Sequence, residues 1–141
     1  MSRIFWDSNL FIYLLEGTGE TADRVAMLRQ RMKERGDQLC TSALTLGEVL
    51  VKPVSEGRKD LVDKYYRALT SATVLMLSFD RECARRYAEI RQDRAIRAPD
   101  ALQLACAANA DCNLFITNDE RLSRKNVAGI DFIVSLQKAF L

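Results

Sequence analysis

Short apolar runs alternate with amphipathic segments along the whole of the sequence. The β-prone runs predict five strands, over residues 4–6, 39–41, 73–79, 114–116 and 132–134. Apolar positions three and four residues apart predict six helices, over residues 8–16, 21–35, 44–51, 61–69, 81–93 and 100–110. Because strand and helix patterns take turns, we expect a three-layer α/β/α sandwich around a mainly parallel central sheet.

Local signals mark where several of these elements begin and end. Gly36 is expected to close the second helix, Pro53 to end the third, and Asp80 to cap the fifth. Residues 73–79 read TVLMLSF, an almost unbroken apolar run. A parallel sheet buries such a strand on both faces, so we expect this one to be buried on both.

The overall composition fits a globular chain. It has 141 residues, 48% of them hydrophobic and 28% charged, and contains no repeats, so we expect a single domain over residues 1–141. A net charge of +2 makes no case for a nucleic-acid partner by itself. Asp7 and Asn9 interrupt the first apolar run, and no run reaches the roughly 18 residues of a membrane span. We therefore expect a cytoplasmic protein without a membrane partner.

The residues that carry most enzyme chemistry are scarce. The chain has no histidine, and its four cysteines (Cys40, Cys83, Cys106 and Cys112) stand far apart in the sequence. Such spacing does not suit a structural zinc site, so we expect buried, free thiols. Without histidine the usual general base is missing too. Any catalysis is expected to depend on carboxylates, metals or cofactors.

Four carboxylates stand where strands end or helices begin: Asp7, Glu48, Asp100 and Asp119. Each has a structural explanation of its own. Asp7 could cap the helix that follows it, and Glu48 could form a capping box with Thr45. Asp100 suits the positive end of a helix dipole, and Asp119 suits a turn. Taken singly, these structural explanations are the stronger ones.

Together the four acids favour a metal site, because a parallel sheet brings strand ends to one edge and ligands bind there. Two carboxylates about 4 Å apart repel by roughly 4 kcal/mol at an effective dielectric constant near 20. A cation relieves this repulsion, and Mg²⁺ or Mn²⁺ prefers oxygen ligands. A metal can also activate water, which makes a histidine unnecessary.

The order of these motifs resembles the PIN-domain ribonucleases, most closely the small VapC-type toxins. The motifs are Asp7-Ser8-Asn9, Glu48 in SALTLGEVL, Asp100 in PDALQLA and Asp119 in TND. The resemblance extends over essentially the whole chain, except that residues 53–73 cannot be aligned. It implies an endoribonuclease dependent on Mg²⁺ or Mn²⁺ that cuts RNA, is inhibited by an antitoxin protein and forms a homodimer.

The resemblance also implies roles for individual residues. Asp7, Asp100 and Asp119 correspond to metal-binding carboxylates, and Glu48 corresponds to an acid that both binds metal and positions the attacking water. Asn9 and Thr117 correspond to polar residues that support the acidic pocket.

Residues 81–97 contain six arginines and three acids and lead directly into Pro99 and Asp100. RNA phosphates could bind there, and we favour contact for Arg94 and Arg97, which approach the acids. The alternative is a solvated helix face with surface ion pairs. Trp6 and Phe11 could stack on bases, but they lie in an apolar run and are expected in the core.

Three other functions remain open from the residues. One is a PIN-like module that has lost activity and serves in binding or dimerisation. A receiver-type signalling domain with a magnesium pocket would need adjacent acids after the first strand, and the chain has Asp7 alone. A phosphatase with an aspartyl nucleophile would need Asp-x-Asp, and position 9 is Asn.

Overall fold

The centre of the molecule is a parallel β-sheet. The structure, a computed structural model, describes residues 1–139 and 141, and within these residues the sheet has five strands: β1 (Arg3–Trp6), β2 (Gln38–Ser42), β3 (Val74–Leu77), β4 (Leu114–Thr117) and β5 (Phe132–Ser135). Their order is β3-β2-β1-β4-β5, and each neighbouring pair is parallel. The prediction of a parallel sheet is confirmed.

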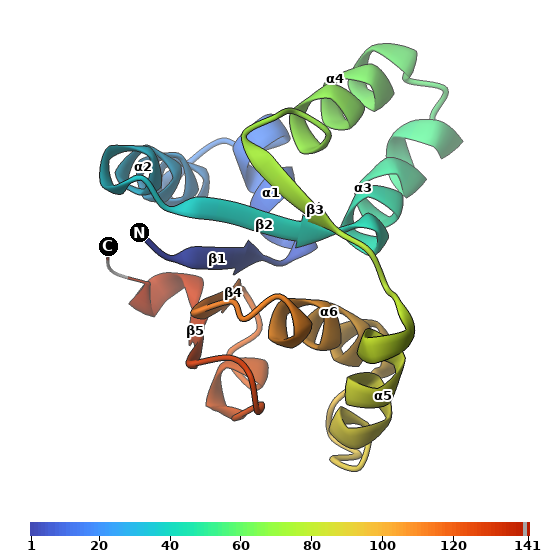
Figure 1. Cartoon of the computed structure of the whole chain (residues 1–141). Coiled ribbons are helices and arrows are strands. Elements are labelled where there is room, and N and C mark those ends of the chain that lie inside the picture. The colour runs from blue at the N-terminus through green and yellow to red at the C-terminus, as the bar shows by residue number, and fades with distance from the viewer. Residues whose placement is uncertain (140) are drawn as a thin grey trace.

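Helices cover both faces of the sheet (Figure 1). On one face lie α1 (Ser8–Glu16), α2 (Glu20–Arg35), α3 (Ala43–Ser55) and α4 (Lys59–Leu69). On the other lie α5 (Arg81–Ile90) and α6 (Ala98–Asn109). This is the predicted three-layer α/β/α sandwich. Two short 3₁₀ helices, η1 (Leu122–Arg124) and η2 (Leu136–Lys138), were not predicted. None of the described helices has the length and hydrophobicity needed to cross a membrane.

Apolar side chains of the strands divide between the two layers. Ile4 and Trp6 of β1 pack among the helices α1 to α4, whereas Phe5 points to the opposite face and stacks on Phe115 of β4 at 4.9 Å. This alternation follows from the pleat of a strand. Trp6 and Phe11 are almost completely buried, so their predicted place in the core is confirmed. All four cysteines are free and buried, also as predicted.

Two of the predicted helix boundaries are correct and one is wrong. Gly36 ends α2 in a left-handed conformation, and the Asp80 carboxylate caps α5 by accepting from the Cys83 N–H at 3.0 Å. Pro53 does not end α3, because the helix continues to Ser55 and stops before Gly57, which has a φ of 66°. Proline costs the helix one backbone donor, but its own carbonyl still accepts from the Arg58 N–H at 2.9 Å.

The strand β3 is not buried on both faces, contrary to the sequence prediction. It is an edge strand that pairs with β2 only, and Leu75 is 36% exposed. Phe79, just beyond it, is 43% exposed. The apolar run therefore belongs to the rim of the sheet, where only one side of the strand has a partner.

Candidate active site

The carboxyl edge of the sheet gathers the four acids from distant parts of the chain. Asp7 follows β1 directly, and Asp119 stands just past β4, the neighbouring strand in the sheet. Glu48 comes from α3, which begins where β2 ends, and Asp100 lies in the first turn of α6. The negative charges of Glu48 and Asp100 act on Asp7, and those of Asp119 and Glu48 act on Asp100.

Asp7 is held by two hydrogen bonds. One carboxylate oxygen accepts from the Ser8 N–H at 2.7 Å, which makes Asp7 the N-cap of α1, and the other accepts from the Thr117 hydroxyl at 3.0 Å. Thr117 accepts in turn from the Asp119 N–H at 3.0 Å. The ends of β1 and β4 are thus connected through side chains, and capping and site formation are compatible roles for Asp7.

Glu48 is held from two sides, by Ser8 of α1 and Gln103 of α6. The Ser8 hydroxyl donates to Glu48 Oε1 at 2.7 Å, and Gln103 Nε2 approaches the same oxygen at 3.3 Å. The capping box with Thr45 is wrong, because α3 begins at Ala43 and its N-cap Ser42 makes no side-chain capping bond. The Ser42 hydroxyl donates instead to Gln103 Oε1.

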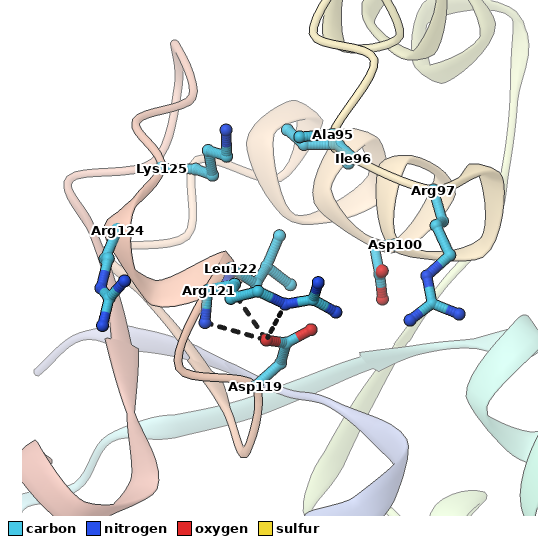
Figure 2. Close-up of a pocket in the computed structure, with 9 residues that line it drawn as sticks. All are labelled: Ala95, Ile96, Arg97, Asp100, Asp119, Arg121, Leu122, Arg124 and Lys125. Carbon is cyan, nitrogen blue, oxygen red and sulfur yellow. Dashed lines mark hydrogen bonds and ion pairs between the residues drawn. The ribbon is translucent and has the colours of Figure 1, made fainter.

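Asp119 is both a turn residue and a site residue. Its Oδ1 accepts from the backbone N–H groups of Arg121 at 2.9 Å and Leu122 at 3.3 Å, and these bonds shape the turn into η1. The predicted turn role is therefore confirmed. Figure 2 shows the Asp119 carboxylate facing the same space as Asp100, with the guanidinium of Arg121 beside them. Arg121 Nε lies 4.0 Å from Asp119 Oδ1.

Burial, and to a lesser extent the neighbouring acids, raises the pKa of two of the four carboxyl groups. Burial raises the pKa of Asp7 above its ordinary value, and the charges of Asp100 and Glu48 raise it further against the hydrogen bonds from Ser8 and Thr117. Burial and then the charge of Asp119 raise the pKa of Asp100, which Arg97 opposes. Burial and mutual repulsion thus disfavour the ionised forms of both acids, and at Asp100 the charge of Arg97 offsets this only in part.

The donor set fits a hard divalent cation. All four acids offer carboxylate oxygens, which Mg²⁺ and Mn²⁺ prefer. A cation would offset the burial that chiefly raises the pKa of Asp7, and also the repulsion from Asp100 and Glu48. Among residues 1–139 and 141, no three acid or thiol side chains are yet close enough to surround an ion. An ion bound here would need these carboxylates to lie closer together than they do in this structure.

A basic pocket of about 290 Å³ adjoins the acids (Figure 2). Asp100 and Asp119 line it together with four cationic side chains: Arg97, Arg121, Arg124 and Lys125. The predicted Arg97 is thus at the site, whereas Arg94 is exposed and does not line this pocket. Of the two polar residues named from the sequence, Thr117 bonds to Asp7, but Asn9 is exposed and bonds to none of the described side chains.

Sequence reasoning missed Ser8, Gln103 and Arg121 as parts of the site. Gln103 left a signal, since it is a polar residue inside the apolar run ALQLA, one helical turn after Asp100. Ser8 and Arg121 gave no comparable signal. The partner of Ser8 is Glu48, 40 residues away, and Arg121 meets Asp119 through the turn that follows β4.

Comparison with known proteins finds one family model and several solved structures that are similar to the chain. The family model of the PIN domain matches residues 4–128. No curated protein matched the sequence significantly. Among solved structures, the chain resembles VapBC2 of Rickettsia felis bound to a promoter DNA fragment, with a TM-score of 0.75 and 14% identity over 94% of this chain and 98% of the other.

Two further structures are similar. A toxin–antitoxin complex of Klebsiella pneumoniae has a TM-score of 0.68 and 22% identity, over 90% of this chain and 94% of the other. VapC20 of Mycobacterium tuberculosis, a toxin that cleaves the sarcin–ricin loop, has a TM-score of 0.68 and 15% identity, over 89% of this chain and 97% of the other. These likenesses share one fold, and the family match covers most of the sequence. The chain belongs to the PIN-domain family.

Proposed function

We propose that this protein is a divalent-metal-dependent endoribonuclease and the toxin of a toxin–antitoxin pair. What supports the proposal is that Asp7 and Asp119 follow two neighbouring strands and Asp100 lies in the first turn of α6, beside a pocket lined by arginines. An acidic centre next to a basic wall suits the hydrolysis of a polyanion, because the two regions bind different parts of it.

The four acids would have different roles in the reaction. Asp7, Asp100 and Asp119 offer the oxygens that would hold Mg²⁺ or Mn²⁺. When bound, such an ion lowers the pKa of water and offsets negative charge on the phosphate. Glu48, with Oε1 already engaged by Ser8, would use its other oxygen to bind the ion or to accept a hydrogen bond from the attacking water. Thr117 keeps Asp7 in place.

The basic pocket would hold phosphates that flank the scissile bond. Arg97 and Arg121 stand next to Asp100 and Asp119, at the boundary between acidic and basic side chains. A guanidinium can bind two phosphate oxygens at once and keeps its charge at any physiological pH. Lys125 is less available, since its ammonium is paired with Asp93 at 2.9 Å. Contact between Arg94 and RNA stays a prediction.

The toxin role and the protein partners rest on relatives. One similar structure is a toxin–antitoxin complex and another is a toxin that cleaves the sarcin–ricin loop, which supports an antitoxin partner for this chain. We also propose a homodimer. Exposed apolar side chains of α3 and α4 (Val51, Val54 and Tyr66) offer a surface for protein contact. Light scattering after size exclusion measures the mass directly, and a monomer at micromolar concentration would contradict the dimer.

The decisive experiment incubates the purified protein with total RNA, with Mg²⁺, with Mn²⁺ or with chelator, and maps the cuts. We expect cleavage only with metal. Asp100→Asn should keep the fold and lose cleavage, because it removes one charged ligand from the site. Asp63→Asn, an exposed acid of α4, is the matched control and should cut normally.

Two results would contradict the proposal. Cleavage by Asp100→Asn at the wild-type level would show that the acidic centre is not the reactive one. No cleavage of any RNA by the wild type, with either metal, would favour the alternative of a PIN-like binding module without activity.

A further inference from the structure

Gln103 is a buried amide at the centre of a side-chain network. It lies on α6, one turn after Asp100, and is 2% exposed. Its Oε1 accepts from the Ser42 hydroxyl, and its Nε2 donates to Thr45 Oγ1 at 2.6 Å and approaches Glu48 Oε1 at 3.3 Å. Both ends of the amide therefore have partners, as a buried polar group requires.

The neighbouring carboxylate determines which way the amide faces. If the amide were rotated by half a turn, Gln103 Oε1 would point at Glu48 Oε1, and two acceptors, one of them charged, would oppose each other. In the observed orientation the N–H groups face the carboxylate and the Thr45 hydroxyl. Gln103 thus presents a donor to Glu48 in a site otherwise crowded with negative charge.

The two donors on Glu48 meet at one oxygen. Ser8 and Gln103 both approach Oε1, and no described residue donates to Oε2. A carboxylate fixed by one oxygen has restricted rotation and keeps the other oxygen available. Since Gln103 and Asp100 share α6, the same helix that carries one acid of the site also fixes the orientation of another.

We propose that Gln103 is a positioning residue that, together with Ser8, anchors Glu48 through Oε1 and leaves Oε2 free for the metal or the attacking water. This inference rests on the proposed function and adds a residue to it. Partners that orient a ligand in this way typically contribute 10–100-fold to metal affinity or activity, and the effect here is expected within about that range.

The test substitutes Gln103 by methionine, which keeps the length of the side chain and removes the donor. We expect kcat for RNA cleavage to fall by about 10–100-fold while KM for RNA stays the same, because Gln103 does not line the basic pocket. Mn²⁺ affinity, measured by calorimetry, should fall as well. Ser8→Ala removes the other donor at a less buried position and should act in the same direction, so the inference does not depend on one variant folding.

A matched control separates positioning from stability. Asp37 is also buried and accepts from the Ser2 N–H and from Arg35 Nε, both at 2.9 Å, beside the first residue of β2 and so away from the carboxyl edge of the sheet. Asp37→Asn should lower the melting temperature and leave kcat and Mn²⁺ affinity unchanged. In a Glu48→Gln background, Gln103→Met should cause no further loss of Mn²⁺ affinity, since the residue acts through Glu48.

The possible results are distinguishable. Wild-type kcat and Mn²⁺ affinity in both Gln103→Met and Ser8→Ala would overturn the inference and leave the proposed function intact. An additive loss of Mn²⁺ affinity on introducing Gln103→Met into the Glu48→Gln background would do the same. If the wild type binds Mn²⁺ but cuts no RNA, the proposed function fails and the affinities still decide the role of Gln103. A wild type that neither binds Mn²⁺ nor cuts RNA overturns both.

Discussion

Asp7 combines a structural role with the proposed chemical one. Its carboxylate caps α1 through Ser8 and accepts from Thr117, yet burial and nearby negative charges still raise its pKa. The raised pKa means that the ionised form is less favourable in the folded chain than in the unfolded one. Because its ionised form lowers the stability of the fold, Asp7 is better explained as a metal-binding residue than as a helix cap alone.

This cost can be measured with Asp7→Asn in the presence of chelator. Asparagine caps helices as well as aspartate does, so the substitution mainly removes the charge. We expect a melting temperature a few degrees higher at pH 7, where roughly 3–4 °C corresponds to 1 kcal/mol for a chain of this length. The difference should shrink as the pH falls through the raised pKa of Asp7 and vanish below about pH 4, the ordinary aspartate range.

The comparison needs a charge control, which Asp63→Asn on the surface of α4 provides. If Asp7→Asn melts lower than the wild type at pH 7, the hydrogen bonds from Ser8 and Thr117 outweigh the cost of burial. Asp7 would then be explained by its structural bonds.

The position of the acids at the edge of the sheet could be predicted from the sequence, and the residues that contact them only in part. Asp7 and Asp119 follow strands, and the order of a parallel sheet implies that such positions meet. Gln103 and Ser8 reach Glu48 across 55 and 40 residues of sequence, so their contacts depend on how α6 and α1 dock. Asn9 was named from a motif, but the side chain that contacts Glu48 is that of Ser8, beside it.

At the scale of elements, two glycines occupy opposite environments. Gly47 lies inside α3 with open space where a Cβ would stand. Gly129 precedes β5 with a φ of 97°, and a Cβ there would lie 3.0 Å from the Ala108 carbonyl oxygen of α6. The first glycine leaves its helix weaker than it needs to be, whereas the second allows the turn to pack against α6.

Alanine at each position should therefore change stability in opposite directions. Gly47→Ala is expected to raise the free energy of unfolding by about 1 kcal/mol, the usual preference of a helix for alanine over glycine. Gly129→Ala should lower it by roughly 1–3 kcal/mol, the cost of strained backbone. Urea denaturation measures both. Equal effects in the two variants would contradict the environments described here.

The helices and strands themselves were predicted better than the residues at which they end and the extent to which they are buried. All five strands were found, because β-prone runs alternate with helical spacing. The end of α3 was missed at Pro53, since a proline in the last turns removes one donor without stopping the helix. The exposure of β3 was missed because an apolar run does not reveal whether its strand lies at the centre or the edge of a sheet.

At the scale of the whole molecule, the fold places acidic, basic and apolar side chains in different regions. The carboxyl edge collects the acids, the α6–η1 side adds the arginines, and the core lies in two layers on either side of the sheet. A net charge of +2 conceals this separation, because the acidic and basic regions nearly cancel in the total. Composition alone therefore could not have indicated a site for a polyanion.

If the acids hold a metal, the ion should stabilise the entire fold, because only the folded chain brings them together. At 100 times its dissociation constant, Mn²⁺ should raise the free energy of unfolding by about 2.7 kcal/mol. The single tryptophan, Trp6, is buried next to Asp7, so its fluorescence reports unfolding from the centre of the sheet. Asp100→Asn should lose most of this gain, whereas Asp37→Asn, beside the start of β2, should keep it. An equal gain in both variants would mean that the ion binds away from the acids, and the proposed metal centre would be wrong.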